Sequence, residues 1–141
     1  NFFFFFNLIL FLDDNFNLGY KSDIELEFKT TRLNGILLSI ANGSDFEAPS
    51  LSVELHNGQI IASVDIGNGP FRAVKAFDSK YDMCDGRWHV VKLQYAKSSV
   101  TLKVDKYEAV YGLSEKESHK IDSFTQSPLY IGGLPGKNPI I

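Results

Sequence analysis

From residue 13 onward, apolar and polar side chains alternate along most of the chain with a period of two. The segment 23–29 is typical, because Ile24, Leu26 and Phe28 fall on one side and charged residues fall on the other. Successive side chains of a β-strand point to opposite faces, so this pattern predicts a strand with one buried face. The same reasoning predicts further strands over 36–40, 51–55, 60–66, 71–77, 88–95, 100–104, 106–111 and 128–131.

Turn signals separate these segments at intervals of about 8 to 12 residues, a spacing typical of β-sandwiches and barrels. Asn34-Gly35 and Asn57-Gly58 are the strongest of these signals, because Asn-Gly favours tight turns between antiparallel strands. No window of a dozen residues carries the apolar period of an amphipathic helix. The sequence therefore predicts an all-β fold, an antiparallel β-sandwich.

The first twelve residues differ from the rest, since residues 2–6 are all Phe and an apolar run follows them. The segment is shorter than the roughly 20 residues that a membrane-spanning helix needs. It also lacks the basic start and small-residue cleavage site of a signal peptide. Continuous apolar runs do occur in strands covered on both faces. We therefore treat 1–12 as a separate apolar segment that can add a strand, and predict the main domain over 13–141.

The chain has 141 residues, of which 44% are hydrophobic and 22% charged, as expected for one globular domain. Its formal net charge is −3. A domain devoted to nucleic-acid binding is more often basic. Any polyanionic partner therefore requires a local basic surface, and we expect no nucleic-acid partner and no insertion into a membrane.

Candidate catalytic residues are few. Asp23, Glu25 and Glu27 line one face of a predicted strand, and some glycoside hydrolases with a related architecture carry strand carboxylates spaced E-x-D-x-x-E. Glycoside hydrolysis needs two carboxyl groups about 5 to 5.5 Å apart or further. The spacing here differs, however, and a solvated outer face explains these charges. His89 should point away from its neighbour Trp88, and no Gly-x-Ser-x-Gly elbow is present. We expect no enzyme.

Two ordered motifs give the chain a family resemblance. Asp85-Gly-Arg-Trp-His-Val opens an alternating strand, and Leu129-Tyr-Ile-Gly-Gly-Leu-Pro135 follows a second one. Together they resemble the laminin G-like domain, and the likeness covers roughly Asp14 to Pro135. The chain is most similar to the C-terminal globular modules of laminin α chains, with counterparts of Phe16-Asn-Leu-Gly-Tyr20, Phe28-Lys-Thr-Thr31 and Cys84-Asp-Gly-Arg-Trp-His89. The resemblance implies a jelly roll of the laminin G-like and concanavalin-like type.

Cys84 and Trp88 acquire expected roles from this resemblance. Cys84 is the one cysteine, so it has no disulfide partner within the chain. The resemblance implies a partner near the domain's C-terminus, after Ile141, and hence a domain that lacks its C-terminal end. The alternative for Cys84 is a small buried hydrophobe. Trp88 is expected to fill the core, although an unbroken strand places it on the same face as Lys92 unless a bulge intervenes.

The resemblance also implies a calcium ion at the rim of the sandwich. Hard cations prefer carboxylate and carbonyl oxygens. The matching loop positions are Asp45 and Asp122, although the first loop is longer and Asp122 comes earlier than the family spacing. Aspartates that cap ordinary turns are the alternative. Asn42-Gly-Ser44 is an N-glycosylation sequon, consistent with secretion, and equally an Asn-Gly turn.

Acidic glycans are the expected ligands. Arg72, Lys75, Lys92 and Lys103 are the candidate glycan-binding residues, and Lys97 and Lys106 lie nearby in the sequence. Exposed lysines also protect sheet edges from aggregation, which is the alternative explanation. By resemblance, we expect a secreted, non-catalytic adhesion module of the extracellular matrix and basement membrane. Its partners would be dystroglycan, heparan sulfate or integrin, and other laminin chains through the rest of the parent protein. A lectin-like or glycan-active sandwich and a steroid-binding relative are the alternatives.

Overall fold

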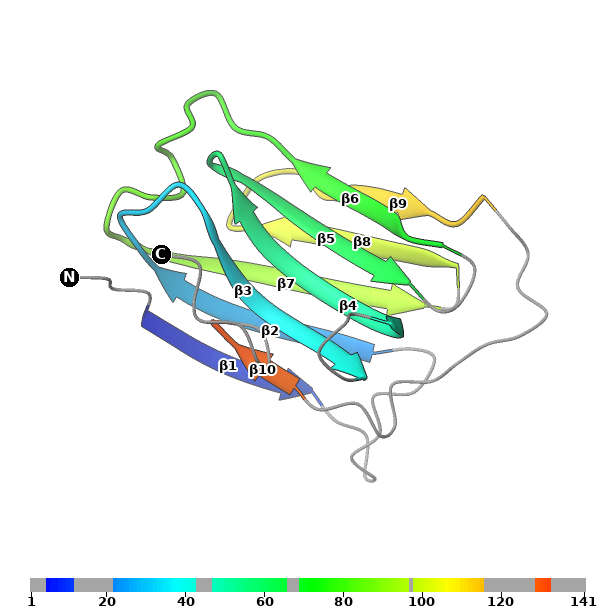
Figure 1. Cartoon of the computed structure of the whole chain (residues 1–141). Helices are drawn as coiled ribbons and strands as arrows, with labels where there is room; N and C mark the ends of the chain where they lie inside the picture. The colour runs from blue at the N-terminus through cyan, green and yellow to red at the C-terminus, as the bar shows by residue number, and fades with distance from the viewer. Residues whose placement is uncertain are drawn as a thin grey trace.

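The computed structural model describes residues 5–11, 22–42, 47–65, 69–96, 98–115 and 129–132. Side chains are described at 23–40, 50–65, 69–96, 98–115 and 130–132. Ten strands in these ranges form two antiparallel five-stranded sheets that pack face to face (Figure 1). This confirms the predicted antiparallel β-sandwich. The described residues contain no helix that could cross a membrane.

Each sheet combines strands that are distant in sequence. Sheet A has the order β1-β2-β7-β8-β9 and consists of β1 (Phe5–Phe11), β2 (Ser22–Lys29), β7 (Trp88–Ala96), β8 (Ser99–Val104) and β9 (Val110–Leu113). Sheet B has the order β10-β3-β4-β5-β6 and consists of β10 (Leu129–Ile131), β3 (Gly35–Asn42), β4 (Glu47–His56), β5 (Gln59–Asp65) and β6 (Phe71–Lys75). The apolar opening segment supplies β1, which pairs with β2 along its whole length.

The core lies between the two sheets and is built from the apolar positions of the alternating strands. Burial removes apolar surface from water at roughly 25 cal/mol per Å², so this face provides most of the driving force for folding. The largest fully buried side chains come from both sheets: Leu26, Phe28, Leu37, Leu38, Ile40, Leu51, Leu55, Ile60, Met83, Leu93 and Tyr95. The described side chains of the two sheets thus pack together as one hydrophobic cluster.

Two strands are shorter than their patterns predict. The segment predicted as a strand over 106–111 becomes β9 only from Val110 onward. Asp105 has a left-handed backbone with φ of 46°, and the Tyr107 N–H donates to the Val104 carbonyl at 3.0 Å, which closes a turn before β9. β6 likewise ends at Lys75 instead of Phe77. The alternation of apolar and polar residues does not show where a strand ends, because it continues into turns whose hydrogen bonds differ from those between strands.

The ends of the sandwich form two rims. The Tyr107 rim contains the connections 30–34, 57–58, 76–87 and 105–109 together with Gly132. Backbone hydrogen bonds join its parts, for example from the Gly58 N–H to the Leu33 carbonyl at 3.0 Å. At the opposite rim lie the ends of β3, β5, β7 and β9 and the starts of β4, β6, β8 and β10 (Figure 1).

Trp88 does not fill the core, so that prediction was wrong. Its relative exposure is 47%, and the Lys29 Nζ lies 5.4 Å from the centroid of its ring. The β2–β7 register runs without a shift from Lys29 opposite Trp88 to Ser22 opposite Tyr95. No bulge therefore changes the parity, and Trp88 shares the outer face with Lys92. The inner face of β7 begins instead at His89, which is 7% exposed. The two side chains do point to opposite faces, as the alternation predicted, but the buried one is His89 and not Trp88.

Candidate functional site

Lys92 and Lys103 face each other across the β7–β8 ladder. They are direct Cα partners in the register, and both are exposed on the outer face of sheet A. Directly opposed residues of an antiparallel pair have Cβ atoms about 4.5 to 5.5 Å apart. Glu25 on β2 lies beside them and places its Oε2 atom 3.8 Å from the Lys92 Nζ. The pairing of β7 with β8 thus brings two cations together, and the carboxylate of Glu25 partly neutralises the charge of Lys92.

Tyr107 connects this pair with a third predicted residue, Lys75. The Lys103 Nζ donates to the Tyr107 carbonyl oxygen at 3.2 Å. The Lys75 Nζ lies 5.6 Å from the centroid of the Tyr107 ring, within the range of a cation–π interaction. Phe77 packs edge-on against the same ring at a centroid distance of 4.9 Å. We call Lys75, Lys92, Lys103 and Tyr107 the basic surface.

The fourth predicted glycan-binding residue, Arg72, lies elsewhere. β6 alternates between buried Phe71 and Ala73 and exposed Arg72 and Val74, so Arg72 points outward from sheet B. Lys92 and Lys103 point outward from sheet A, on the other side of the sandwich. Lys106 is exposed in the turn next to Tyr107, and Lys97 lies outside the described residues. The tertiary structure therefore brings three of the four predicted residues together and separates the fourth.

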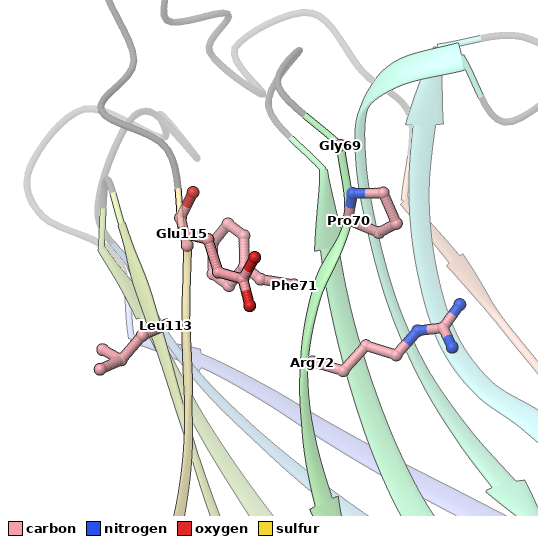
Figure 2. A pocket seen from close by; sticks show the side chains of 7 residues that line it. Gly69, Pro70, Phe71, Arg72, Leu113 and Glu115 are labelled. Atoms are coloured by element: carbon pink, nitrogen blue, oxygen red, sulfur yellow. The ribbon is translucent and has the colours of Figure 1, made fainter.

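A hollow of about 510 Å³ lies between the start of β6 and the end of β9. Figure 2 shows the Phe71 ring turned towards β9 and the Arg72 side chain turned away from it. Glu115 contributes the one carboxylate among its lining residues, which are Gly69, Pro70, Phe71, Arg72, Leu113, Ser114 and Glu115. Glycoside hydrolysis requires two carboxyl groups, and the described lining of this hollow supplies one.

The strand carboxylates of β2 also lack an enclosed setting. Asp23 is exposed, Glu25 and Glu27 are partly buried, and all three alternate with buried Ile24 and Leu26. They therefore lie on the outer face of sheet A, as the alternation predicted. Glu25 is paired with Lys92. The position supports the interpretation of these charges as a solvated strand face.

Several predicted residues fall partly or wholly outside the described part of the chain. Asp45 and Asp122 are not among the described residues, and the side chain of Asn42, the last residue of β3, is not described. Within the described ranges no group of three or more His, Cys, Asp or Glu side chains is arranged to hold a metal ion. Cys84 is a buried free thiol, 7% exposed, whose Sγ donates to the Lys80 carbonyl oxygen at 3.6 Å. Its disulfide with a residue beyond Ile141 stays a prediction.

One polar cluster was missed by the sequence analysis. Asp85, His89 and Asp105 meet at the Tyr107 rim, where both ring nitrogens of His89 contact carboxylates. The four-residue spacing between Asp85 and His89 was a weak signal within the motif. Asp105 gave no signal of its own, because sixteen residues separate it from His89 and only the β7–β8 pairing brings the two together.

Comparisons with known proteins agree with this architecture. The family model of the laminin G domain matches residues 28–140. Human laminin subunit alpha-1 is 32% identical over 121 residues, which cover 83% of this chain and 4% of that protein. Mouse laminin subunit alpha-4 is 30% identical over 124 residues, which cover 88% of this chain and 6% of that protein. The chain thus spans a small fraction of the length of these relatives.

A solved structure supports the same assignment. The structure of mouse laminin alpha1 chain domains LG4-5 superimposes with a TM-score of 0.72 and 25% sequence identity, covering 96% of this chain and 35% of that chain. The matched family model covers most of the described strands, including the two that carry Lys92 and Lys103. The family-model match over most of the chain and the identity to laminin subunits show that this chain belongs to the laminin G domain family.

Proposed function

We propose that this laminin G domain is a secreted, non-catalytic adhesion module of the extracellular matrix, which binds acidic glycans at the cell surface through its basic surface. Its laminin relatives are extracellular matrix proteins, which supports an adhesion role in general. The observation that carries the proposal is the direct pairing of Lys92 with Lys103. The finer assignment to a glycan is our own.

The physical argument begins with repulsion. Like charges directly opposite each other on a sheet destabilise it, and the chain as a whole is acidic with a net charge of −3. A bound sulfate or carboxylate group would offset the repulsion between Lys92 and Lys103. Lys75 lies over the ring of Tyr107, whose carbonyl oxygen accepts from Lys103, and so adds a third cation on the same residue. A polyanion with repeated charges, such as heparan sulfate or an acidic glycan of dystroglycan, matches this arrangement.

Heparin affinity chromatography tests the proposal. Lys92→Gln and Lys103→Gln should each elute at lower salt than the wild type, because the attraction depends on local charge and is screened by salt. Arg72→Gln is the matched control, since it removes the same charge from the opposite face. Its elution should stay close to that of the wild type.

Two results would count against the proposal. Equal losses in Arg72→Gln and Lys103→Gln would mean that heparin senses only the overall charge. Unchanged elution in both lysine variants would exclude the basic surface and favour a protein receptor such as an integrin, contacted elsewhere on the domain. Circular dichroism of each variant would verify that the fold is intact.

We also propose a calcium ion at the opposite rim, held by Asp45 and Asp122. Leu129 pairs with Ile40, so the end of β3 and the start of β10 lie side by side at that rim. The chain leaves β3 three residues before Asp45 and enters β10 seven residues after Asp122. Calorimetric titration with calcium should show saturable binding that disappears in Asp45→Asn/Asp122→Asn. Absence of binding to the wild type would exclude this ion from the adhesion mechanism.

Two further parts of the proposal are N-glycosylation at Asn42 and association with other laminin chains. N-glycosylation at Asn42 would appear as a mass decrease after enzymatic deglycosylation of protein made in a secretory host. Association with other laminin chains, through the rest of the parent protein, is likewise a proposal. Pull-down of the full-length parent protein with and without this domain would show whether the domain is needed.

A further inference from the structure

Each of the two ring nitrogens of His89 contacts the carboxylate of a different aspartate. The Nδ1 atom lies 2.8 Å from an oxygen of Asp105, and the Nε2 atom lies 2.9 Å from an oxygen of Asp85. His89 is 7% exposed and lies near the start of β7, on the inner face of that strand. Asp85 belongs to the connection 76–87, whereas Asp105 belongs to the turn between β8 and β9. The ring therefore links two separate parts of the Tyr107 rim, which the edge-on contact of Phe77 with Tyr107 also joins.

The two contacts place a requirement on the protons. An ionised carboxylate only accepts hydrogen bonds, and a neutral imidazole carries one N–H and one bare nitrogen. Both contacts are hydrogen bonds only when the ring carries both protons and a positive charge. In a neutral ring, the nitrogen without a proton would turn its lone pair towards a carboxylate oxygen that lies 2.8 or 2.9 Å away. That geometry would be repulsive.

Among the described residues, the charged groups in contact with the ring are these two carboxylates, and one arginine lies next to Asp85. Asp85 faces the ring from the connection, and the Arg87 Nε atom lies 4.0 Å from the other oxygen of Asp85. Asp105 faces it from the turn. From β2 the neighbour is the uncharged ring of Phe28, at a centroid distance of 5.6 Å. Burial alone would lower the pKa of His89, but its hydrogen bonds to Asp105 and Asp85 outweigh burial and raise that pKa.

The two aspartates differ in how firmly they are held in place without the histidine. Asp105 also accepts a hydrogen bond from the Val90 N–H at 2.7 Å, and its own N–H donates to the Val90 carbonyl at 2.9 Å. Asp105 thus stays fixed to β7 without the ring. Asp85 is 35% exposed, so water can replace the histidine there. A ring that loses a proton should keep its bond to Asp105 and release Asp85.

We propose that Asp85, His89 and Asp105 form a proton-dependent clamp that fastens the connection 76–87 to the β8–β9 turn. The clamp is closed while His89 carries both ring protons, and it releases the connection on the Asp85 side when the ring becomes neutral. The clamp requires no bound ligand, so it does not depend on the proposed glycan binding.

The sign of the pH dependence follows from linkage. A raised pKa of His89 in the folded protein means that its stabilisation is fully present below the ordinary value of 6.5 and is lost as the pH rises through the folded-state value. Asp85 influences stability at the acidic end of the pH range. Burial alone would raise its pKa, but the backbone N–H of Arg87 and the contact with His89 lower it. Its stabilisation is therefore lost only as the pH falls below 3.8.

Nuclear magnetic resonance tests the clamp directly. The ¹⁵N shifts of the His89 ring, followed against pH, should give a titration midpoint that moves to lower pH in Asp85→Asn and in Asp105→Asn. Asp78→Asn is the matched control, because Asp78 is an exposed carboxylate of the same connection. An unchanged midpoint in Asp85→Asn, or an equal change in Asp78→Asn, would overturn the proposal.

Amide exchange supplies a second readout that a merely structural histidine would not change. The Gly86 N–H donates to the Thr30 carbonyl at 3.0 Å and reports on the connection. Above the His89 midpoint its exchange should become faster than base catalysis alone predicts, whereas the Gly58 N–H, bonded to Leu33, should not. If both amides follow base catalysis through the titration, the connection is not released and the clamp is refuted. This measurement uses the wild type, so misfolding of a variant cannot obscure it.

Discussion

Gly112 on β9 lies against the backbone of Arg72 on β6, although the two strands belong to different sheets. A Cβ atom added to Gly112 would lie 2.2 Å from the Arg72 carbonyl oxygen and 2.4 Å from its carbonyl carbon. β6 and β9 are the edge strands of their sheets on the same side of the sandwich (Figure 1). Only a residue without a side chain allows the two edges to approach so closely.

Gly112→Ala should therefore destabilise the domain. The obstructing atoms are backbone atoms, which cannot rotate away, so the two edges must separate. Overpacking of this kind costs about 1 to 3 kcal/mol, and we expect a loss in that range in chemical denaturation. Gly69→Ala is the control, because its Cβ would meet nothing within 4 Å and would suffer only the strain of a φ of 95°. Equal stability of Gly112→Ala and the wild type would show that the two edges can separate freely.

Trp88 should behave as a surface residue. Its substitution by Phe should cost less than about 1 kcal/mol, because most surface substitutions and exposed cation–π contacts are worth no more. Phe28→Ala, at a fully buried position, should cost about 3 to 5 kcal/mol. Trp88 is the one tryptophan, so its fluorescence can be read without interference. Emission like that of solvated indole and quenching by iodide are expected, and a blue-shifted, unquenched emission would contradict the exposed position.

Glu25→Gln should strengthen the binding of heparin. The substitution removes the carboxylate that lies 3.8 Å from the Lys92 Nζ, and it leaves Lys92 and Lys103 without this counter-charge. Exposed ion pairs are worth about 0.2 to 1 kcal/mol, so the fold should lose little stability. The variant should elute from heparin at higher salt than the wild type.

Asp23→Asn is the control for this gain. It removes the same charge from the same strand, but its register partner on β7 is Gln94, not a lysine. A gain in Asp23→Asn as large as that in Glu25→Gln would point to net charge as the cause. Turnover of a glycan substrate that Glu25→Gln abolishes would instead support the glycan-active alternative.

Cys84 should react slowly with thiol reagents in the native protein. Burial raises its pKa above the ordinary 9.0, and the negative charges of Asp85 and Asp82 raise it further. The thiolate is the reactive form, so at pH 8 a disulfide reagent should modify the folded domain much more slowly than the unfolded chain. Comparable rates in the two states would show that the site opens readily.

Much of the fold could be predicted because alternation is local. Period-two patterns identified the inner face of β2 at Ile24, Leu26 and Phe28, and the same parity placed Lys92 and Lys103 outside. Parity also required Trp88 to share a face with Lys92. The error was to assign the large aromatic side chain to the core, where the unshifted β2–β7 register places His89 instead. Hydrophobicity alone could not choose between these two residues at the end of a strand.

The sequence by itself determined the strand class, the family and the inward faces of regular strands such as β2, because these depend on neighbours one or two positions apart and on ordered motifs. Only the tertiary structure decided which distant residues meet. Lys75 contacts Tyr107 because β6 and the β8–β9 turn end at one rim, and Arg72 lies apart because β6 turns it outward. Asp105 reaches His89 through the β7–β8 register. Such contacts follow from the pairing of strands, which local alternation does not encode.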